Sequence, residues 1–249
     1  MTADSLPKQV SKRKQREEQF LGHGTGATTT LSSELVICAI SQLKLALDDR
    51  RRPVFRTPSN HYSPHALGSI LLLVAALEAW LNEAIWLLWL GREDLKPLAF
   101  EPVGTKYYEI PRRVAGSTIP PQTELGLVIE LRHEIAHFLP RVIQQEGNVP
   151  PWFVELHRRR LFLTGSQPKA DFVLSQKLAC YRLAYWAWET VSAAITDFLE
   201  ALGPQSDVVR WTASNFGQYR DVPSPSQLAT YDAEHKLELT ERESRDKGS

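Results

Sequence analysis

The chain of 249 residues contains little cysteine and carries no net charge. Its two cysteines, Cys38 and Cys180, both fall in apolar stretches, which argues against a disulfide framework and predicts two small core residues in a reducing compartment. Lysine plus arginine and aspartate plus glutamate both number 29, so no global charge attracts nucleic acid or a membrane surface. Any site for a polyanion must therefore be a local patch.

Clear strand patterns and targeting signals are also missing from the sequence. No segment alternates apolar and polar residues over enough positions to predict a β-strand. The polar, basic start of the chain is not followed by an apolar run, so we expect no secretory signal and a cytoplasmic location. Residues 1–30 and 221–249 are polar, and we expect them to be disordered tails that flank a folded domain over 31–220.

The sequence does contain apolar segments with helical spacing. Apolar residues make up 43% of the chain, which is typical of a folded globular protein. The expected fold class is all-α, a bundle of four to five helices. Capping residues, prolines and glycines predict helices at about 33–49, 64–90, 123–139, 152–162 and 175–202, with a further short one near 106–114.

One predicted helix is long and apolar enough, over residues 67–90, to span a bilayer. It also contains Glu78, Asn82 and Glu83, and an acidic residue at the centre of a spanning helix costs roughly 2.5–3.5 kcal/mol. The other amphipathic helices need a central partner. We therefore expect this segment to be the buried central helix of the bundle, without membrane contact.

Two polar features fall on apolar helix faces. At about 100° per residue, Glu78 and Asn82 lie one turn apart within a strongly apolar stripe. Arg132 points at the apolar sector of its helix, whereas His133 and His137 lie on the polar face. Because a charge in an apolar environment needs a partner, we expect Glu78 to pair with Arg132. This pair is either a structural network in the core or a carboxylate that orients a functional group.

The segment 131–137 reads LRHEIAH and fits two patterns. The first is the His-Glu-x-x-His pattern of zinc metallopeptidases, in which two histidines one turn apart bind zinc and the glutamate is the general base. Here those residues are His133, His137 and Glu134. A third ligand is also required, and Glu155 and His157 lie at possible distances downstream but in no familiar motif.

The same segment resembles the ribonuclease motif of the HEPN superfamily, which reads arginine, a polar residue, three further residues and histidine. Arg132, His133 and His137 fill these places, and the flanking residues resemble the family wording LRNxIAH, with His133 where asparagine is usual. Upstream, residues 77–82 read LEAWLN and resemble the LExxxN helix of many HEPN-like proteins. The order of the two helices is also the family's, and the resemblance covers residues 31–202.

The resemblance implies a metal-independent endoribonuclease without a cofactor. HEPN domains are helical bundles that usually dimerise, so that two motif helices form one shared cleft. There the RNA 2′-OH attacks the adjacent phosphate, His137 moves protons and Arg132 stabilises the phosphoryl charge. His133, Glu78 and Asn82 are implied as supporting residues. Arg132 and His137 lie roughly 140° apart on one helix, a separation that a two-chain cleft relieves.

The resemblance also implies partners: an RNA substrate, a second copy of the chain, and an antitoxin or regulatory protein. Many HEPN ribonucleases are toxins or phage-defence effectors. Two short basic runs are weaker candidates for contact with the RNA backbone, namely Arg112, Arg113, Arg158, Arg159 and Arg160. Many HEPN domains are inactive, so a non-catalytic helical interaction module is the first alternative function, and a zinc metallopeptidase is the second.

Overall fold

The computed structural model of the chain describes residues 31–51, 63–89, 92–137, 151–159, 161 and 178–216. Within these ranges the regular structure is helical and contains no strand, which confirms the all-α class. Both predicted tails, 1–30 and 221–249, lie outside the described residues. The first described helix begins at Leu31.

The described ranges contain eight helices, whereas the sequence predicted a bundle of four to five and a further short helix near 106–114. Two of them, η2 and α9, were not predicted; both are short and begin with acidic residues, which stabilise a helix N-terminus. Such short helices are set mainly by tertiary packing, and periodicity detects them poorly. The helices are α2 (Leu31–Arg51), α3 (Pro64–Leu88), the 3₁₀ helix η2 (Glu93–Phe100), α4 (Val103–Ala115), α5 (Thr123–Ala136), α6 (Pro151–Arg158), α8 (Tyr181–Leu202) and α9 (Asp207–Phe216).

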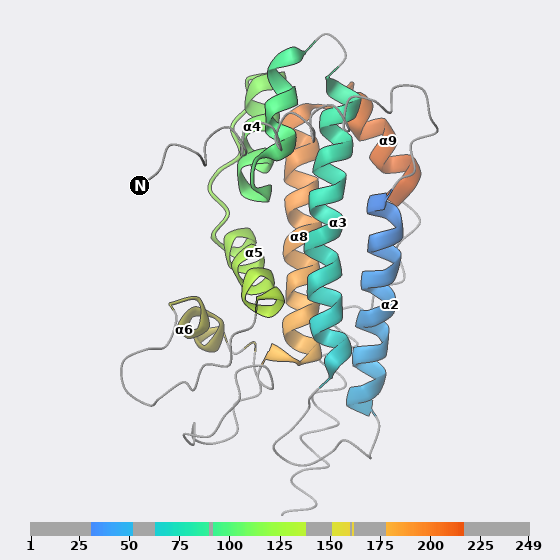
Figure 1. Cartoon of the computed structure of the whole chain (residues 1–249), viewed down its shortest axis with the longest axis vertical. Coiled ribbons are helices and arrows are strands. Elements are labelled where there is room, and N and C mark those ends of the chain that lie inside the picture. The colour runs from blue at the N-terminus through green and yellow to red at the C-terminus, as the bar shows by residue number, and fades with distance from the viewer. Residues whose placement is uncertain are drawn as a thin grey trace, which may run out of the picture. The chain divides into compact units, whose positions relative to one another are not determined.

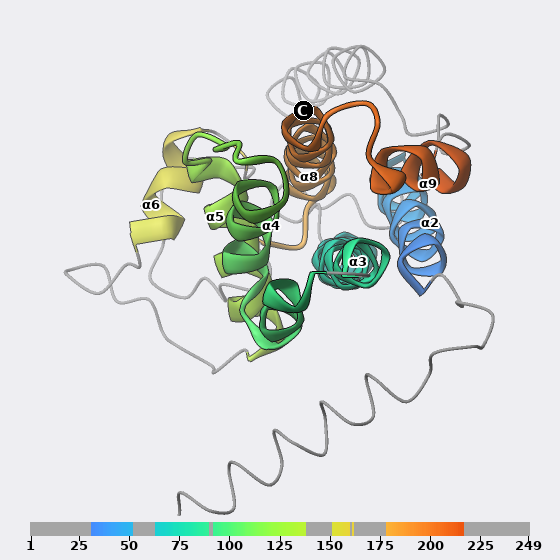
Figure 2. The same cartoon turned by 90° about the horizontal axis from the view of Figure 1, so that it is seen from above.

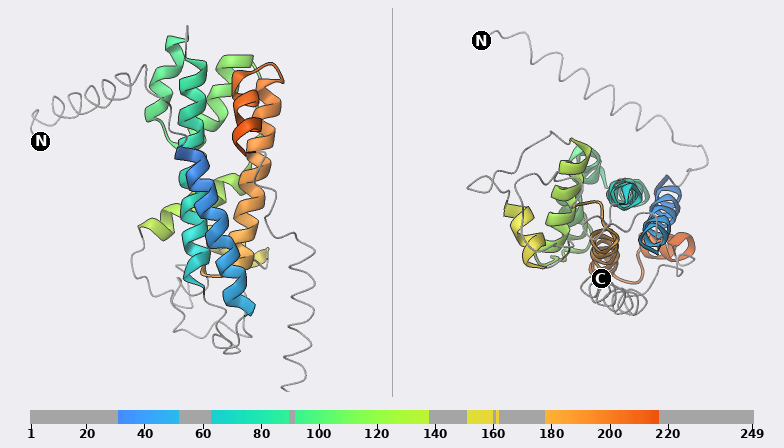
Figure 3. Two further views of the ribbon diagram at one scale, coloured as in Figure 1. Left: turned by 90° about the vertical axis from the view of Figure 1, so that its right-hand side faces the viewer. Right: turned by 90° about the horizontal axis from the view of Figure 1, so that it is seen from below.

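Helix α3 is the central element of the bundle. It contacts α2, α4, α5, α8 and α9, and Figure 1 shows it running alongside α8. Seen from above, it lies between α2 on one side and the α4–α5 pair on the other (Figure 2). Figure 3 shows α2 lying against α3 and α8, in agreement with their contacts. The expected central position of this helix is therefore what the structure shows.

Among the described residues, α3 is the one helix long and apolar enough to cross a membrane, judged by length and composition alone. Half of its most apolar window (50%) is buried among the other helices. Its buried residues include Leu73, Leu77, Leu81 and Ile85, which contribute to the main apolar core. A core helix has this same composition.

An aromatic cluster joins α3 to the helices around it. Trp80 is 1% exposed, and its ring packs edge-on against Phe198 of α8 at a centroid distance of 4.9 Å. The indole N–H of Trp80 donates a hydrogen bond of 3.1 Å to Thr212 of α9. Tyr107 of α4 packs on the same Phe198 and donates through its hydroxyl to the carbonyl of Ala194 at 3.0 Å. Both buried polar tips therefore have partners.

A carboxylate of α3 holds the first turn of α2. The backbone N–H of Ser32 donates to Glu83 Oε1 at 3.1 Å, and the Ser32 hydroxyl donates to the other oxygen of that carboxylate. The first N–H groups of a helix have no partner within it and attract negative charge, so Glu83 replaces a local cap. Burial raises the pKa of Glu83, although the hydrogen bonds from Ser32 act in the opposite direction.

Substitution Glu83→Ala is expected to lower the free energy of unfolding by about 1–2 kcal/mol, because it leaves the buried Ser32 groups unpaired. Since the folded-state pKa of Glu83 lies above its ordinary 4.5, the folded protein holds this proton more tightly than the unfolded chain. Stability should therefore fall as the pH rises from about 4.5 through the raised pKa, and Glu83→Gln should remove that slope. Urea unfolding at several pH values measures both effects. Glu200→Ala, at an exposed position of α8, is the control, and an equal loss there would contradict the capping role.

The two cysteines lie in different environments. Cys180 is buried, as predicted, and its thiol donates to the carbonyl of Leu161 at 3.3 Å. Cys38 is exposed on α2, so its prediction as a core residue is wrong. The reason is that α2 has more apolar residues than its buried face can hold, and Ile37 and Leu45 are also exposed, at 40% and 39%.

Candidate functional site

Helix α5 carries the sequence motif and lies against α3, α8, α4 and α6. It begins at Thr123, after the Pro120–Pro121 pair and the N-cap residue Gln122, and has Glu124 in its first turn, where a carboxylate suits the helix dipole. One face is anchored in the core by Leu125, Val128 and Leu131, each at most 1% exposed. The other face, towards the end of the helix, is left to solvent. The motif therefore stands on a rigid support with an open side.

His133 and His137 lie next to each other on that open side. Their ring centroids are 4.6 Å apart with an interplanar angle of 50°, and both side chains are exposed. The prediction that the two imidazoles share one helix face is confirmed. His137 is the residue at which α5 ends: its backbone, with φ −113° and ψ 30°, leaves the helix, and its N–H donates to the carbonyl of His133 at 3.0 Å. The predicted continuation of the helix to about 139 lies outside the described residues.

Arg132, which the sequence directed at the apolar sector of its helix, is half-buried. Glu78, the carboxylate expected to pair with Arg132, lies next to a different cation. The ammonium of Lys106 on α4 lies 3.7 Å from Glu78 Oε1, so the predicted pairing of Glu78 with Arg132 is wrong. Helical periodicity assigned Glu78 and Arg132 to apolar faces, but it could not determine which helices face each other.

Lys106 is the centre of a buried polar network between α3 and α4. Its side chain is 2% exposed, and Nζ donates a hydrogen bond of 2.7 Å to Asn82 Oδ1. Glu78, 42% exposed, supplies a charge from the rim. Burial lowers the pKa of Lys106, and the charge of Glu78 opposes this shift. Glu78 and Asn82 thus attach α4 to α3. Of the two interpretations that the sequence allowed, this is the structural network in the core.

Sequence reasoning missed Lys106, although a signal was present. Val103, Tyr107 and Ile110 are spaced three and four residues apart around it, so Lys106 falls on the apolar face of its helix. A lysine on such a face needs an acceptor, as the two polar residues of α3 needed a cation. The two oppositely charged residues on apolar helix faces that pair with each other are therefore Glu78 and Lys106.

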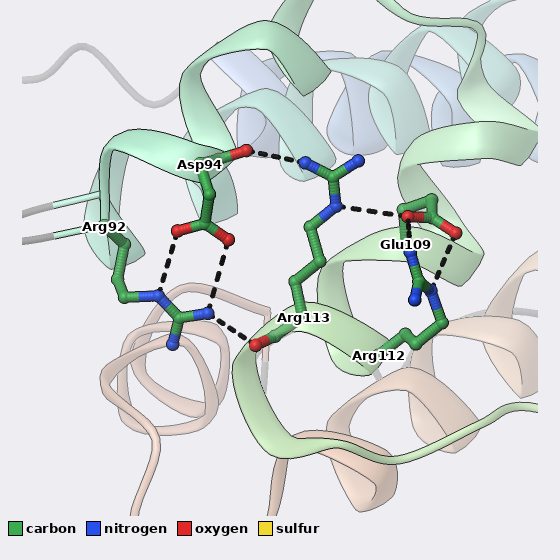
Figure 4. Close-up of polar contacts among 5 residues, drawn as sticks. All are labelled: Arg92, Asp94, Glu109, Arg112 and Arg113. Atoms are coloured by element: carbon green, nitrogen blue, oxygen red, sulfur yellow. Dashed lines mark hydrogen bonds and ion pairs between the residues drawn. The ribbon is translucent and has the colours of Figure 1, made fainter.

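The first basic run is engaged in pairs at the end of α4. Glu109 accepts hydrogen bonds from both Arg112 and Arg113, which lower the pKa of its carboxyl to about 2. Arg113 also donates to the backbone carbonyl of Asp94 at 2.7 Å, and Arg92 pairs with the side chain of Asp94. Figure 4 shows these residues joining η2 to α4. The run thus ties two neighbouring elements together, and its contact with RNA stays a prediction.

The second basic run is paired in a similar way. Glu155 accepts hydrogen bonds from Arg158 and Arg159 at 2.6 and 2.7 Å, and these bonds lower the pKa of its carboxyl to about 2. Arg159 also forms an ion pair with Glu124 in the first turn of α5. This network fastens α6 to the helix that carries the motif. Arg160 lies outside the described residues.

The histidine pair has no third metal ligand within the described ranges. There, no group of three or more histidine, cysteine, aspartate or glutamate side chains could hold a metal ion. Of the two candidates from the sequence, Glu155 is held by arginines and His157 is exposed on α6. The described part of the chain therefore supplies two imidazoles for a zinc ion and no third ligand.

An apolar pocket of about 150 Å³ lies between α2, α3 and α8. Its walls include Trp80, Leu77, Trp188 and Val191, and Ser192 is the one polar residue among those that line it. It offers no acid, base or charged group for catalysis. The chemically equipped position in the described part of the chain is the end of α5. Comparisons of the chain with protein families, with curated proteins and with solved structures found no match.

Proposed function

We propose that the chain is a metal-independent endoribonuclease of the HEPN type, with its site at the end of α5. One observation carries the proposal: His133 and His137 lie side by side in solvent, with their ring centroids 4.6 Å apart, directly after Arg132. A rigid helix supports these groups, and preorganised groups on a fixed support are what catalysis by proton transfer and charge stabilisation requires.

The proposed reaction needs only side chains of these kinds. An imidazole takes the proton of the RNA 2′-OH, and the resulting oxygen attacks the adjacent phosphorus. The bond from phosphorus to the 5′-oxygen breaks, leaving a 2′,3′-cyclic phosphate and a 5′-hydroxyl. Imidazole suits the task because its unperturbed pKa, roughly 6.5, lies near neutral pH. The planar guanidinium of Arg132 would contact the non-bridging phosphate oxygens, and His137 would be the principal acid/base residue.

The proposed site is shared across a homodimer. Arg132 and His137 are roughly 140° apart around α5, so one copy does not present both groups in the same direction. A second copy that sets its α5 against the first would bring Arg132 of the partner subunit towards His137. We propose this organisation for a cytoplasmic toxin or phage-defence effector. An antitoxin or another regulatory protein would inhibit it.

A specific observation favours one alternative, a non-catalytic helical interaction module. Glu78 and Asn82, the upstream half of the family resemblance, bind Lys106, and no hydrogen bond or ion pair joins them to the described motif residues Arg132, His133 or His137. In this alternative the residues of α5 would bind a partner without chemistry, and the exposed histidines would be dispensable for that partner's affinity.

The purified chain, incubated with structured and unstructured RNAs in excess EDTA, is expected to cleave RNA and leave 2′,3′-cyclic phosphate ends. End-group analysis by mass spectrometry identifies these products. EDTA separates the hypotheses because a zinc enzyme loses its metal and its activity, whereas the proposed mechanism uses none. Failure to cleave any RNA would favour the interaction module, and cleavage that stops in EDTA would favour a metal site.

A further inference from the structure

We infer that His133 is a second catalytic residue, so that one α5 helix supplies both the general acid and the general base. The inference rests on the proposed function and goes beyond the supporting role that the family resemblance implies for this position. It comes from the geometry of the pair rather than from the motif. Two imidazoles in contact range of one phosphate can divide the two proton transfers of the reaction between them.

The two rings are close enough together to serve one phosphoryl group. The attacking 2′-oxygen and the leaving 5′-oxygen lie on opposite sides of the phosphorus, so the base and the acid must reach two different atoms of one group. His133 and His137 are one helical turn apart, with centroids 4.6 Å apart and rings tilted by 50°. Because both side chains are exposed, rotation about their side-chain bonds would let the two rings face two oxygens of a single phosphodiester.

The surroundings of His133 give it no evident structural role. The side chain is exposed, whereas the residues of α5 that anchor the helix are Leu125, Leu127, Val128 and Leu131. Its ring lies next to the ring of His137. An amide at this place could only hydrogen-bond, but an imidazole can also exchange a proton with substrate and solvent.

The complete step balances with these two groups alone. A neutral imidazole accepts the 2′-OH proton while the bond from the 2′-oxygen to phosphorus forms. The other ring, as imidazolium, donates its proton to the 5′-oxygen while the bond from phosphorus to that oxygen breaks. The products are a 2′,3′-cyclic phosphate and a 5′-hydroxyl, and the pair ends with its protons exchanged. Proton exchange with water through the open side restores the starting state.

The test compares His133→Asn and His133→Ala with the wild type on two RNAs that differ at one atom. One RNA has the ordinary 5′-oxygen at the cleavage site, and the other has a bridging 5′-sulfur, which leaves as a thiolate without needing a proton. Both variants are expected to cleave the oxygen substrate about 10²–10⁴-fold more slowly. If His133 is the acid, the sulfur substrate should restore cleavage by His133→Ala but not by His137→Ala. If His133 is the base, the sulfur substrate should restore cleavage by His137→Ala but not by His133→Ala.

Each outcome has a distinct meaning. Unchanged cleavage by His133→Asn, with cleavage lost in His137→Ala, overturns the role of His133 while the ribonuclease stands. Slow cleavage by both His133→Ala and His137→Ala, with neither rescued by sulfur, also overturns the acid–base pair. No cleavage of either RNA by the wild type overturns the ribonuclease itself. His157→Ala, at an exposed histidine of α6, is the matched control, and circular dichroism verifies that each variant keeps its helices.

Discussion

His137→Ala is expected to slow RNA cleavage by about 100- to 10,000-fold while leaving the helical fold unchanged. The side chain is exposed and stands at the residue where α5 ends, so its removal opens no cavity and strands no buried group. The anchoring residues Leu125, Val128 and Leu131 keep their positions in the core. A loss of rate of this size without a loss of stability would locate the chemistry at the end of α5.

Single-turnover cleavage in excess EDTA measures this effect, with circular dichroism and thermal unfolding as checks on the fold. His157→Ala is the appropriate control, because it also removes an exposed imidazole from a helix near α5. Added imidazole should restore part of the activity of His137→Ala if the missing group transfers a proton. Equal rates for the wild type and His137→Ala would remove this residue from the site and shift attention to partner binding.

The largest expected effect on stability comes from the network around Lys106. The double substitution Glu78→Gln and Asn82→Leu should lower the free energy of unfolding by about 3–5 kcal/mol, because it strands a cation in the core. Asn82 should account for the greater share, since it forms the 2.7 Å hydrogen bond to Lys106, whereas Glu78 is 42% exposed and screened by water. In the double variant Lys106 can release its proton, which limits the loss in the free energy of unfolding.

Adding Lys106→Met to this double variant should restore most of the lost stability. Methionine fills a similar space without a charge, so the stranded cation disappears. In the wild-type background, Lys106→Met should change stability little, because water can solvate the exposed Glu78. The folded protein gives up the Lys106 proton at lower pH than the unfolded chain, so the stability of the wild type relative to Lys106→Met should rise as pH increases from the lowered pKa towards 10.5.

Urea unfolding of the four proteins at two pH values completes this thermodynamic cycle. The comparison with the triple variant separates a stranded charge from a simple loss of packing. If the triple variant were as unstable as the double variant, the destabilisation would arise from altered packing of α3. A loss below about 0.5 kcal/mol in the double variant would mean that Lys106 finds other partners.

The sequence was sufficient to predict the central helix and the faces of the motif helix. Apolar residues with helical spacing identified α3, and two histidines four positions apart on a helix must share a face whatever surrounds them. Both predictions concern a single helix, in which the backbone geometry alone determines direction. The exposed placement of His133 and His137 follows from the same rule.

Contacts between helices were much harder to predict. The sequence paired Glu78 with Arg132 because both fall on apolar helix faces, whereas the cation next to Glu78 is Lys106 of α4. The first turn of α2 shows the same limitation, because its partner Glu83 lies 51 residues away from Ser32 along the chain. Such pairings depend on how far each helix is rotated and shifted against its neighbours, which depends on the whole core.

The unequal burial of the two cysteines gives the protein a natural pair of kinetic reporters. Cys38 is exposed on α2, so a thiol reagent can reach it in the folded state. Cys180 is buried next to Leu161, so the same reagent can modify it only after that region opens. The ratio of the two labelling rates therefore measures the free energy of opening around the start of α8, in the unmodified protein and without a spectroscopic probe. RNA or a protein partner that stabilises this region would slow the modification of Cys180 alone.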